Sequence, residues 1–106
     1  MKLQWFHILL ALSQGPLHGY GIQREILDRT GGRLRLWPAT LYRLLGKLEG
    51  HGLVETVEAP VEEPEDQRRQ YYSLTRHGVA RLQEEAAMLA EWARAASDVT
   101  PGVEGA

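Results

Sequence analysis

The sequence of 106 residues predicts a single, mainly α-helical domain that carries one small β-hairpin. Two observations lead to this prediction. Residues 38–49 repeat leucine at helical spacing, and two strand-like runs, 53–57 and 69–74, flank a Pro- and Glu-rich loop. A helix followed by strand, loop and strand is the order found in a winged helix-turn-helix, a fold that presents its helix to DNA.

Two further helices are expected before residue 38. An apolar stripe at helical spacing predicts the first over residues 3–13, which a Gly-Pro pair then interrupts. A second stripe, which includes Tyr20, ends at Thr30 before two glycines that suit a left-handed cap. Residues 33–36 alternate Arg with Leu, which predicts a short extended segment and a candidate minor strand.

The helix from Pro38 to Glu49 has one apolar and one polar side. Proline suits the first helical position, because its missing N–H would be unpaired there anyway. The apolar side carries the leucines at i, i+3, i+4 and i+7: Leu41, Leu44, Leu45 and Leu48. The opposite side carries residue types that bind phosphates and base edges: Thr40, Tyr42, Arg43 and Lys47.

The last predicted helix, residues 76–97, is N-capped by Thr75 and has the spacing of a seam between helices. Apolar residues recur at alternating intervals of three and four: Val79, Leu82, Ala86, Leu89, Ala93 and Ala96. We expect self-association through this seam; the alternative is a helix that folds back on its own domain. The expected organisation is a DNA-binding domain over 1–75, a dimerisation helix over 76–97 and a disordered tail over 98–106.

Composition excludes several classes of protein and site. The chain has no cysteine, which excludes disulfides, thiolate metal sites and cysteine nucleophiles. It has no apolar run long enough to span a bilayer, and its first residues lack the features of a signal peptide, so a cytoplasmic location is expected. The four histidines are scattered, no phosphate-binding glycine loop occurs, and no serine has an activating context. We therefore predict no metal, no cofactor and no catalysis.

Charge is distributed unevenly, although the net charge is only -2. Residues 18–48 hold six basic against two acidic side chains, a net of +4, and residues 55–69 hold six acidic against two basic, a net of -4. A DNA-binding face needs only local positive potential. For any single arginine, simple solvation of a helix surface remains the alternative.

Four segments resemble the PadR family of bacterial transcriptional regulators: 15–22 (GPLHGYGI), 36–43 (LWPATLYR), 48–55 (LEGHGLVE) and 68–78 (RRQYYSLTRHG). The resemblance spans roughly residues 5–82, and the order and spacing of the segments make it specific. It implies a winged helix-turn-helix homodimer that represses genes from palindromic operators. With a single C-terminal helix, the chain resembles the short subfamily, some members of which sense hydrophobic compounds at the dimer interface. Trp37 departs from the family pattern, which usually has a small hydroxyl residue at this position. Its side chain has no oxygen with which to cap the helix that follows.

From the residues and the resemblance together we predict the contacts with double-stranded DNA. Arg43 is the candidate for base reading, because arginine to guanine is the commonest specific contact. Phosphate contacts are assigned to Tyr20, Thr40, Tyr42 and Lys47. Arg68 and Arg69 are expected at the backbone or the adjacent minor groove. For Tyr42 the alternative is packing within its own domain.

A hydrophobic effector is a further hypothesis. An alanine-rich seam flanked by large apolar groups could leave a gap for a flat ligand, which gives a candidate ligand site: Trp5, Ile8, Met88 and Trp92. The alternative for Trp92 is plain interface packing. The rival function for the whole chain is a winged-helix module that binds another protein through its acidic wing, without DNA.

Overall fold

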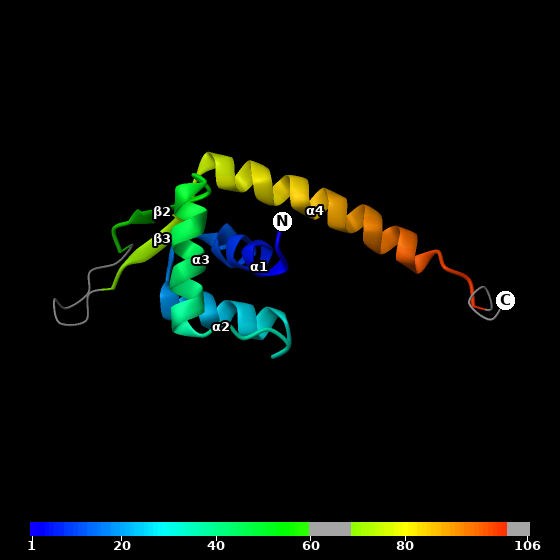
Figure 1. Cartoon of the computed structure of the whole chain (residues 1–106), viewed down its shortest axis with the longest axis horizontal. Coiled ribbons are helices and arrows are strands. Elements are labelled where there is room, and N and C mark those ends of the chain that lie inside the picture. The colour runs from blue at the N-terminus through cyan, green and yellow to red at the C-terminus, as the bar shows by residue number, and fades with distance from the viewer. Residues whose placement is uncertain (60–68, 102–106) are drawn as a thin grey trace.

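The structure, a computed structural model, describes residues 1–59 and 69–101 and is mainly helical with a small three-stranded sheet (Figure 1). Its helices are α1 (Leu3–Ala11), α2 (Gly19–Arg29), α3 (Pro38–Gly50) and α4 (Arg76–Ser97), with a 3₁₀ turn, η1 (Leu12–Gln14), after α1. Its strands are β1 (Leu17–His18), β2 (Val54–Val57) and β3 (Tyr71–Leu74). The predicted fold class is confirmed, and the helices begin and end within a few residues of the expected positions.

The core lies where α3 runs across α1 and α2 (Figure 1). The apolar stripe of α3 supplies four buried leucines, as its spacing predicts. Ile8 and Leu9 of α1 and Ile22 and Ile26 of α2 are likewise fully buried. Burying an aliphatic side chain of this size contributes about 1.5–3 kcal/mol, so this cluster fixes how α3 is rotated about its axis.

The third strand of the sheet is β1, not the segment 33–36 in which a minor strand was expected. The sheet is antiparallel in the order β1-β3-β2, and His18 of β1 pairs with Tyr71 of β3. Residues 33–36 form no strand, so that prediction is wrong. The reason is that side chains in and just after α2 pair with two backbone groups of this segment. The Thr30 hydroxyl accepts from the Leu34 N–H at 3.0 Å, and the Gln23 amide donates to the Leu36 carbonyl at 2.7 Å.

Glycine ends both α2 and α3 in the left-handed conformation. After α3, Gly52 has φ +73°, and the Leu53 N–H donates to the Leu48 carbonyl at 3.0 Å. After α2, Gly31 has φ +60°, as the sequence predicted. This is the Schellman arrangement, in which the residue beyond the cap also packs against the last turn. Leu53 and Leu48 are both buried, so the chain re-enters the core directly after the exposed turn at His51 and Gly52.

The start of α4 is tied closely to the turn before β2. The Thr75 hydroxyl caps the helix by accepting from the Gly78 N–H at 2.9 Å, and it donates to the Gly52 carbonyl at 2.6 Å. A side chain at position 78 would collide with the backbone carbonyl of Leu53. Glycine is therefore required there for close approach between α4 and the turn.

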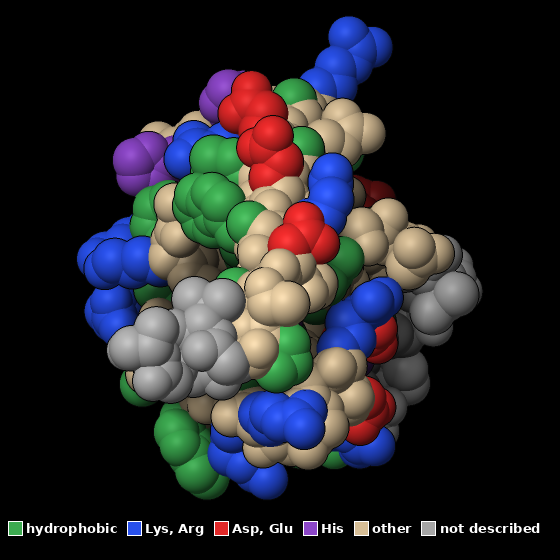
Figure 2. Space-filling view, turned by 90° about the vertical axis from the view of Figure 1, so that its right-hand side faces the viewer, with side chains coloured by type: hydrophobic (Ala, Val, Ile, Leu, Met, Phe, Trp, Pro, Cys, Tyr) green, Lys and Arg blue, Asp and Glu red, His purple; other side chains and the backbone are tan. Residues whose placement is uncertain are grey.

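The remainder of α4 projects away from the domain (Figure 1), and the molecule measures 64 × 27 × 22 Å. Of its 22 residues only Gly78, Leu82 and Glu85 are buried. From residue 86 to 97 every side chain is exposed except the half-buried Leu89. Figure 2 views the molecule from the side toward which α4 projects and shows hydrophobic side chains exposed among charged ones. The helix thus packs on α1 only through its first half.

Some sequence predictions fall outside the described residues. The Pro- and Glu-rich loop lies there except for Ala59, and so do the last five residues of the predicted tail. Residues 98–101 are described and follow the end of α4 as non-helical backbone. Among the described residues, no helix is long and apolar enough to cross a membrane.

Two helical glycines predict opposite effects on stability. Gly78→Ala should lower the free energy of unfolding by about 1–3 kcal/mol, because the new methyl group meets the Leu53 carbonyl. Gly46→Ala should raise it by about 1 kcal/mol, because its methyl group enters open space in the middle of α3. Urea unfolding followed by circular dichroism measures both. Equal shifts of the two variants in the same direction would contradict this account of the α4 junction.

Candidate nucleic-acid interface

The side of α3 opposite its leucines forms a basic, solvent-facing surface. Arg43 and Lys47 are exposed there, and Thr40 is half-buried at the edge. Within residues 1–59 and 69–101 neither cation forms an ion pair. Ala39 and Gly46 lie on the same outer side, so around Arg43 the helix backbone is covered by little side-chain bulk.

Trp37 is the residue immediately before α3. No side chain caps the helix, and Pro38 occupies its first turn, both as the sequence suggests. The Trp37 ring is 63% exposed, and the Arg35 guanidinium lies over it at 5.2 Å from the centroid. A cation over an indole face is held by about 0.5–1 kcal/mol at exposed sites. The pair therefore places one exposed cation, Arg35, beside the N-terminus of α3.

Tyr20 and Arg24 form another exposed pair, one turn apart on α2. The Arg24 Nη1 donates to the Tyr20 hydroxyl at 3.0 Å, and its guanidinium lies 5.8 Å from the ring centroid. This hydrogen bond, with the charges of Tyr20 and Asp28, raises the pKa of Arg24 above its ordinary value. Tyr20 is 57% exposed, so its hydroxyl is open to a partner in solvent.

Tyr42 is both packed and exposed. A side chain at Gly19 would collide with the Tyr42 hydroxyl, so the ring reaches across to the start of α2. About half of its surface remains exposed. Burial, with Tyr42 and Glu49 nearby, raises the pKa of Tyr72 on the adjacent strand. Tyr42 therefore joins α3 to α2 while it leaves surface free for a partner.

His18 connects the start of α2 with β3, which together with β2 forms the wing of the fold. Its Nδ1 accepts from the Gly21 N–H at 3.0 Å and so caps α2. Its ring meets Tyr71 edge-on at 5.2 Å and lies nearly parallel to Tyr20 at 6.3 Å. On its outer side, Nε2 lies 3.0 Å from Nη1 of Arg69. Arg68, the other predicted wing contact, lies outside the described residues.

The predicted ligand residues differ in how far they are exposed. Ile8 has no exposed surface, which corrects the expectation that it is available to a ligand. Trp5 is half-buried, with its ring 5.2 Å from His51 and its buried Nε1 unpaired among the described residues. Met88 and Trp92 lie on the projecting part of α4, 37% and 60% exposed.

The predicted seam residues divide between the two halves of α4. Leu82 belongs to the core of its own domain, and Val79 is 43% exposed. The remaining four, Ala86, Leu89, Ala93 and Ala96, lie on the projecting half, where Leu89 is half-buried and the alanines are exposed.

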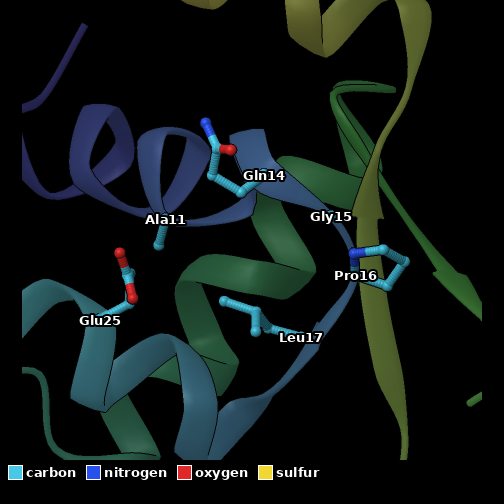
Figure 3. A pocket seen from close by; sticks show the side chains of 6 residues that line it. All are labelled: Ala11, Gln14, Gly15, Pro16, Leu17 and Glu25. Carbon is cyan, nitrogen blue, oxygen red and sulfur yellow. The ribbon is translucent and has the colours of Figure 1, made fainter. Parts of the chain in front are cut away.

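A hollow lies between the end of α1 and the middle of α2 (Figure 3). It is lined by Ala11, Gln14, Gly15, Pro16, Leu17 and Glu25. The carboxylate of Glu25 is already paired with Arg29 at 2.8 Å. The hollow is open to solvent and its walls are mostly apolar and backbone, so it presents little chemistry for a specific ligand.

Comparison with known families decides the identity of this fold. Residues 8–84 match the transcriptional regulator PadR-like family, which is most of the described chain. The chain belongs to the PadR-like family. Its members are transcriptional regulators, which agrees with the exposed basic side of α3.

Relatives of known sequence or structure agree with this assignment. Over 83 residues the chain is 39% identical to an uncharacterized 37.1 kDa protein of transposon Tn4556 from Streptomyces fradiae; the match covers 78% of this chain but only 22% of that protein. A PadR-like transcription factor from Bacteroides fragilis is similar in structure, with a TM-score of 0.74, 28% identity and coverage of 92% and 90% of the two chains. Bacillus subtilis PadR in complex with operator DNA has the same fold, with a TM-score of 0.70, 23% identity and coverage of 81% and 46%.

Sequence reasoning missed two features of this PadR-like chain. His18 was counted only as one of four scattered histidines; neither its capping of α2 nor the proximity of its Nε2 to Arg69, 51 residues away, was predicted. The stacking of Arg35 on Trp37 was also missed, although their spacing of two residues in an extended segment would have allowed it.

Proposed function

We propose that this PadR-like chain is a sequence-specific repressor that binds a palindromic operator as a homodimer. One observation carries the DNA-binding part of the proposal. The leucines of α3 are buried while Arg43 and Lys47, on its other side, are exposed without acidic partners among the described residues. A basic helix surface that is unpaired among the described residues suits a partner rich in negative charge.

Helix α3 has the shape as well as the charge to enter a major groove. The groove is about 12 Å wide, enough for one helix with its side chains. Ala39 and Gly46 on the outer side leave the backbone close to any surface that α3 approaches, and Arg43 projects between them. We assign Arg43 to a base edge, and Lys47 and Thr40 at the flank to phosphates. Tyr20 and Tyr42 are assigned to phosphates next to the start of α2.

Arg43 and Lys47 should differ in what their removal does. Arg43→Ala should relax specificity at one base pair of each half-site, at about 1–3 kcal/mol of lost discrimination, because a bidentate contact to guanine is removed. Lys47→Ala should weaken binding to operator and random DNA alike and reduce the slope of log K against log salt by about one. Fluorescence anisotropy with an operator selected from a random library, at several salt concentrations, measures both.

Arg29→Ala is the matched control, because that guanidinium is already paired with Glu25 on the exposed side of α2. It should leave affinity and salt slope close to wild type. If the Arg43 and Lys47 variants bound operator and random DNA as wild type does, α3 would not be the reading helix. If the wild-type chain bound no DNA at any salt concentration, the rival function as a protein-binding module would be supported instead.

The homodimer is proposed from the projecting half of α4. A helix of about a dozen residues is marginal in water without packing partners. This half carries Met88, Leu89 and Trp92, none of which is buried within the chain. Ala86, Ala93 and Ala96 continue the three-and-four spacing and allow close approach of a second helix. A second copy of α4 satisfies these requirements and gives the two-fold symmetry that a palindromic operator needs.

Two alanine substitutions on the same helix test the seam. Ala93→Glu places a carboxylate in the proposed contact, and Ala87→Glu places the same group about a third of a turn around the helix axis from it, away from the seam. Ala93→Glu should raise the dimer dissociation constant at least about tenfold, since an unpaired charge would be desolvated. Ala87→Glu should change it little. Sedimentation equilibrium measures both; a monomeric wild type, or equal effects of the two variants, would contradict the seam.

A hydrophobic effector that binds at the dimer interface is also proposed. With Ile8 buried, the candidate site reduces to Trp5, Met88 and Trp92, and it would exist only where two copies of α4 meet. A ligand there would act by favouring a spacing of the two α3 helices that no longer fits successive grooves. Quenching of tryptophan fluorescence by planar hydrophobic compounds should be strong in wild type and weak in Trp92→Ala. Equal binding by a Trp92→Ala variant that remains dimeric would exclude this site.

A further inference from the structure

The two ring nitrogens of His18 both face N–H donors. The Gly21 backbone N–H points to Nδ1 at 3.0 Å, and Nη1 of Arg69 lies 3.0 Å from Nε2. A neutral imidazole has one acceptor nitrogen and one N–H, an imidazolium has no acceptor, and an arginine has no acceptor at all. Only one of these two contacts can therefore be a hydrogen bond.

The contact with Gly21 is the one that the fold preserves. That N–H belongs to the first turn of α2, where it has no partner within the helix, and an unpaired backbone donor away from water costs about 1–3 kcal/mol. The position of His18 is fixed independently, because its backbone pairs with Tyr71 in the sheet and its ring meets the ring of the same residue edge-on. Arg69 is exposed and can be solvated without the imidazole. Nδ1 is therefore the acceptor, and Nε2 carries the hydrogen.

This tautomer brings two donors together without an acceptor between them. The Nε2–H of His18 and the guanidinium of Arg69 lie side by side, and no acidic side chain in the described segments pairs with Arg69. Two N–H donors at 3.0 Å repel each other unless one oxygen accepts from both. A singly charged oxyanion fits that requirement, because it accepts several hydrogen bonds and neutralises the guanidinium.

We propose that His18 and Arg69 together bind one phosphate of the DNA backbone. This inference rests on the proposed DNA-binding function and adds to it a neutral histidine donor with a fixed tautomer. His18 is the last residue of β1 and caps α2, and Arg69 lies in the chain entering β3, so a shared phosphate fixes the wing relative to α2. Tyr20, nearly parallel to the His18 ring, borders the same site.

The tautomer can be measured without DNA. Long-range ¹H–¹⁵N spectra of the imidazole rings identify the protonated nitrogen, and the signals of His18 are those missing from His18→Ser. Serine retains an oxygen that caps α2 but lacks the ring donor. The expected result is a hydrogen on Nε2. A hydrogen on Nδ1 would overturn the proposal, because Nε2 would then accept from Arg69 and the two donors would no longer be free together.

The binding test uses the full chain, with His18→Ser, Arg69→Ala and the double variant, on operator and random DNA over a range of salt. His18→Ser should lower the affinity for both DNAs about five- to tenfold with the salt slope unchanged, because a neutral donor displaces no counterion. Arg69→Ala should lower the affinity and also reduce the slope by about one. The double variant should lose less than the product of the two single losses, since both groups hold the same phosphate.

The controls separate failure of this site from failure of DNA binding. His77→Ser, at an exposed histidine in the first turn of α4, should bind as wild type does, and thermal unfolding should confirm that every variant is folded. If wild type binds DNA but His18→Ser loses nothing, or the double variant is additive, the shared phosphate is overturned while the proposed function stands. If wild type binds no DNA, the DNA assignment is overturned; a saturable shift of His18 Nε2 with inorganic phosphate, absent in Arg69→Ala, would then assign the pair to a free oxyanion.

Discussion

The burial of the leucine side of α3 is the constraint on which the rest of this structure depends. Four leucines on one side of a thirteen-residue helix leave one rotation of that helix about its axis. That rotation turns Arg43 and Lys47 to solvent and brings the Tyr42 hydroxyl against Gly19. Turning α3 to hide its basic side would expose four leucines, at about 1.5–3 kcal/mol each. The exposure of this basic surface is thus a consequence of core packing.

A second consequence of the fold is that α4 serves two purposes along its length. Its first turns are fixed to the core by the Thr75 cap and by the contact of Gly78 with Leu53. Its second half extends beyond the domain with its apolar side chains exposed, apart from the half-buried Leu89. Because the first half is held rigidly, any helix that pairs with the second half also sets the distance between two copies of α3. In the proposed homodimer, the geometry of the two subunits would set the spacing of the half-sites in this way.

Much of this arrangement could be predicted from local pattern. Periodicity predicted the helices, a threonine cap predicted the start of α4, and a pair of glycines predicted the end of α2. What local pattern could not give depends on contacts across the chain. The alternation at residues 33–36 was outweighed by hydrogen bonds from Gln23 and Thr30, the short strand at Leu17–His18 exists only by pairing with β3, and Ile8 is buried by elements that follow it. The proximity of His18 and Arg69 could not be predicted from local pattern either, because the two residues are 51 positions apart in the sequence.

The central claim, that α3 lies in the major groove of each half-site, can be tested by affinity cleavage. The chain contains no cysteine, so Glu49→Cys, at the exposed edge of α3, gives a single attachment point for a DNA-cleaving reagent. Glu91→Cys on the projecting half of α4 is the control. The account predicts cleavage from position 49 at two places on the operator, related by two-fold symmetry and about 10 bp or a multiple of it apart, with little cleavage from position 91. A bound conjugate that cleaves from position 91 but not from position 49 would contradict it.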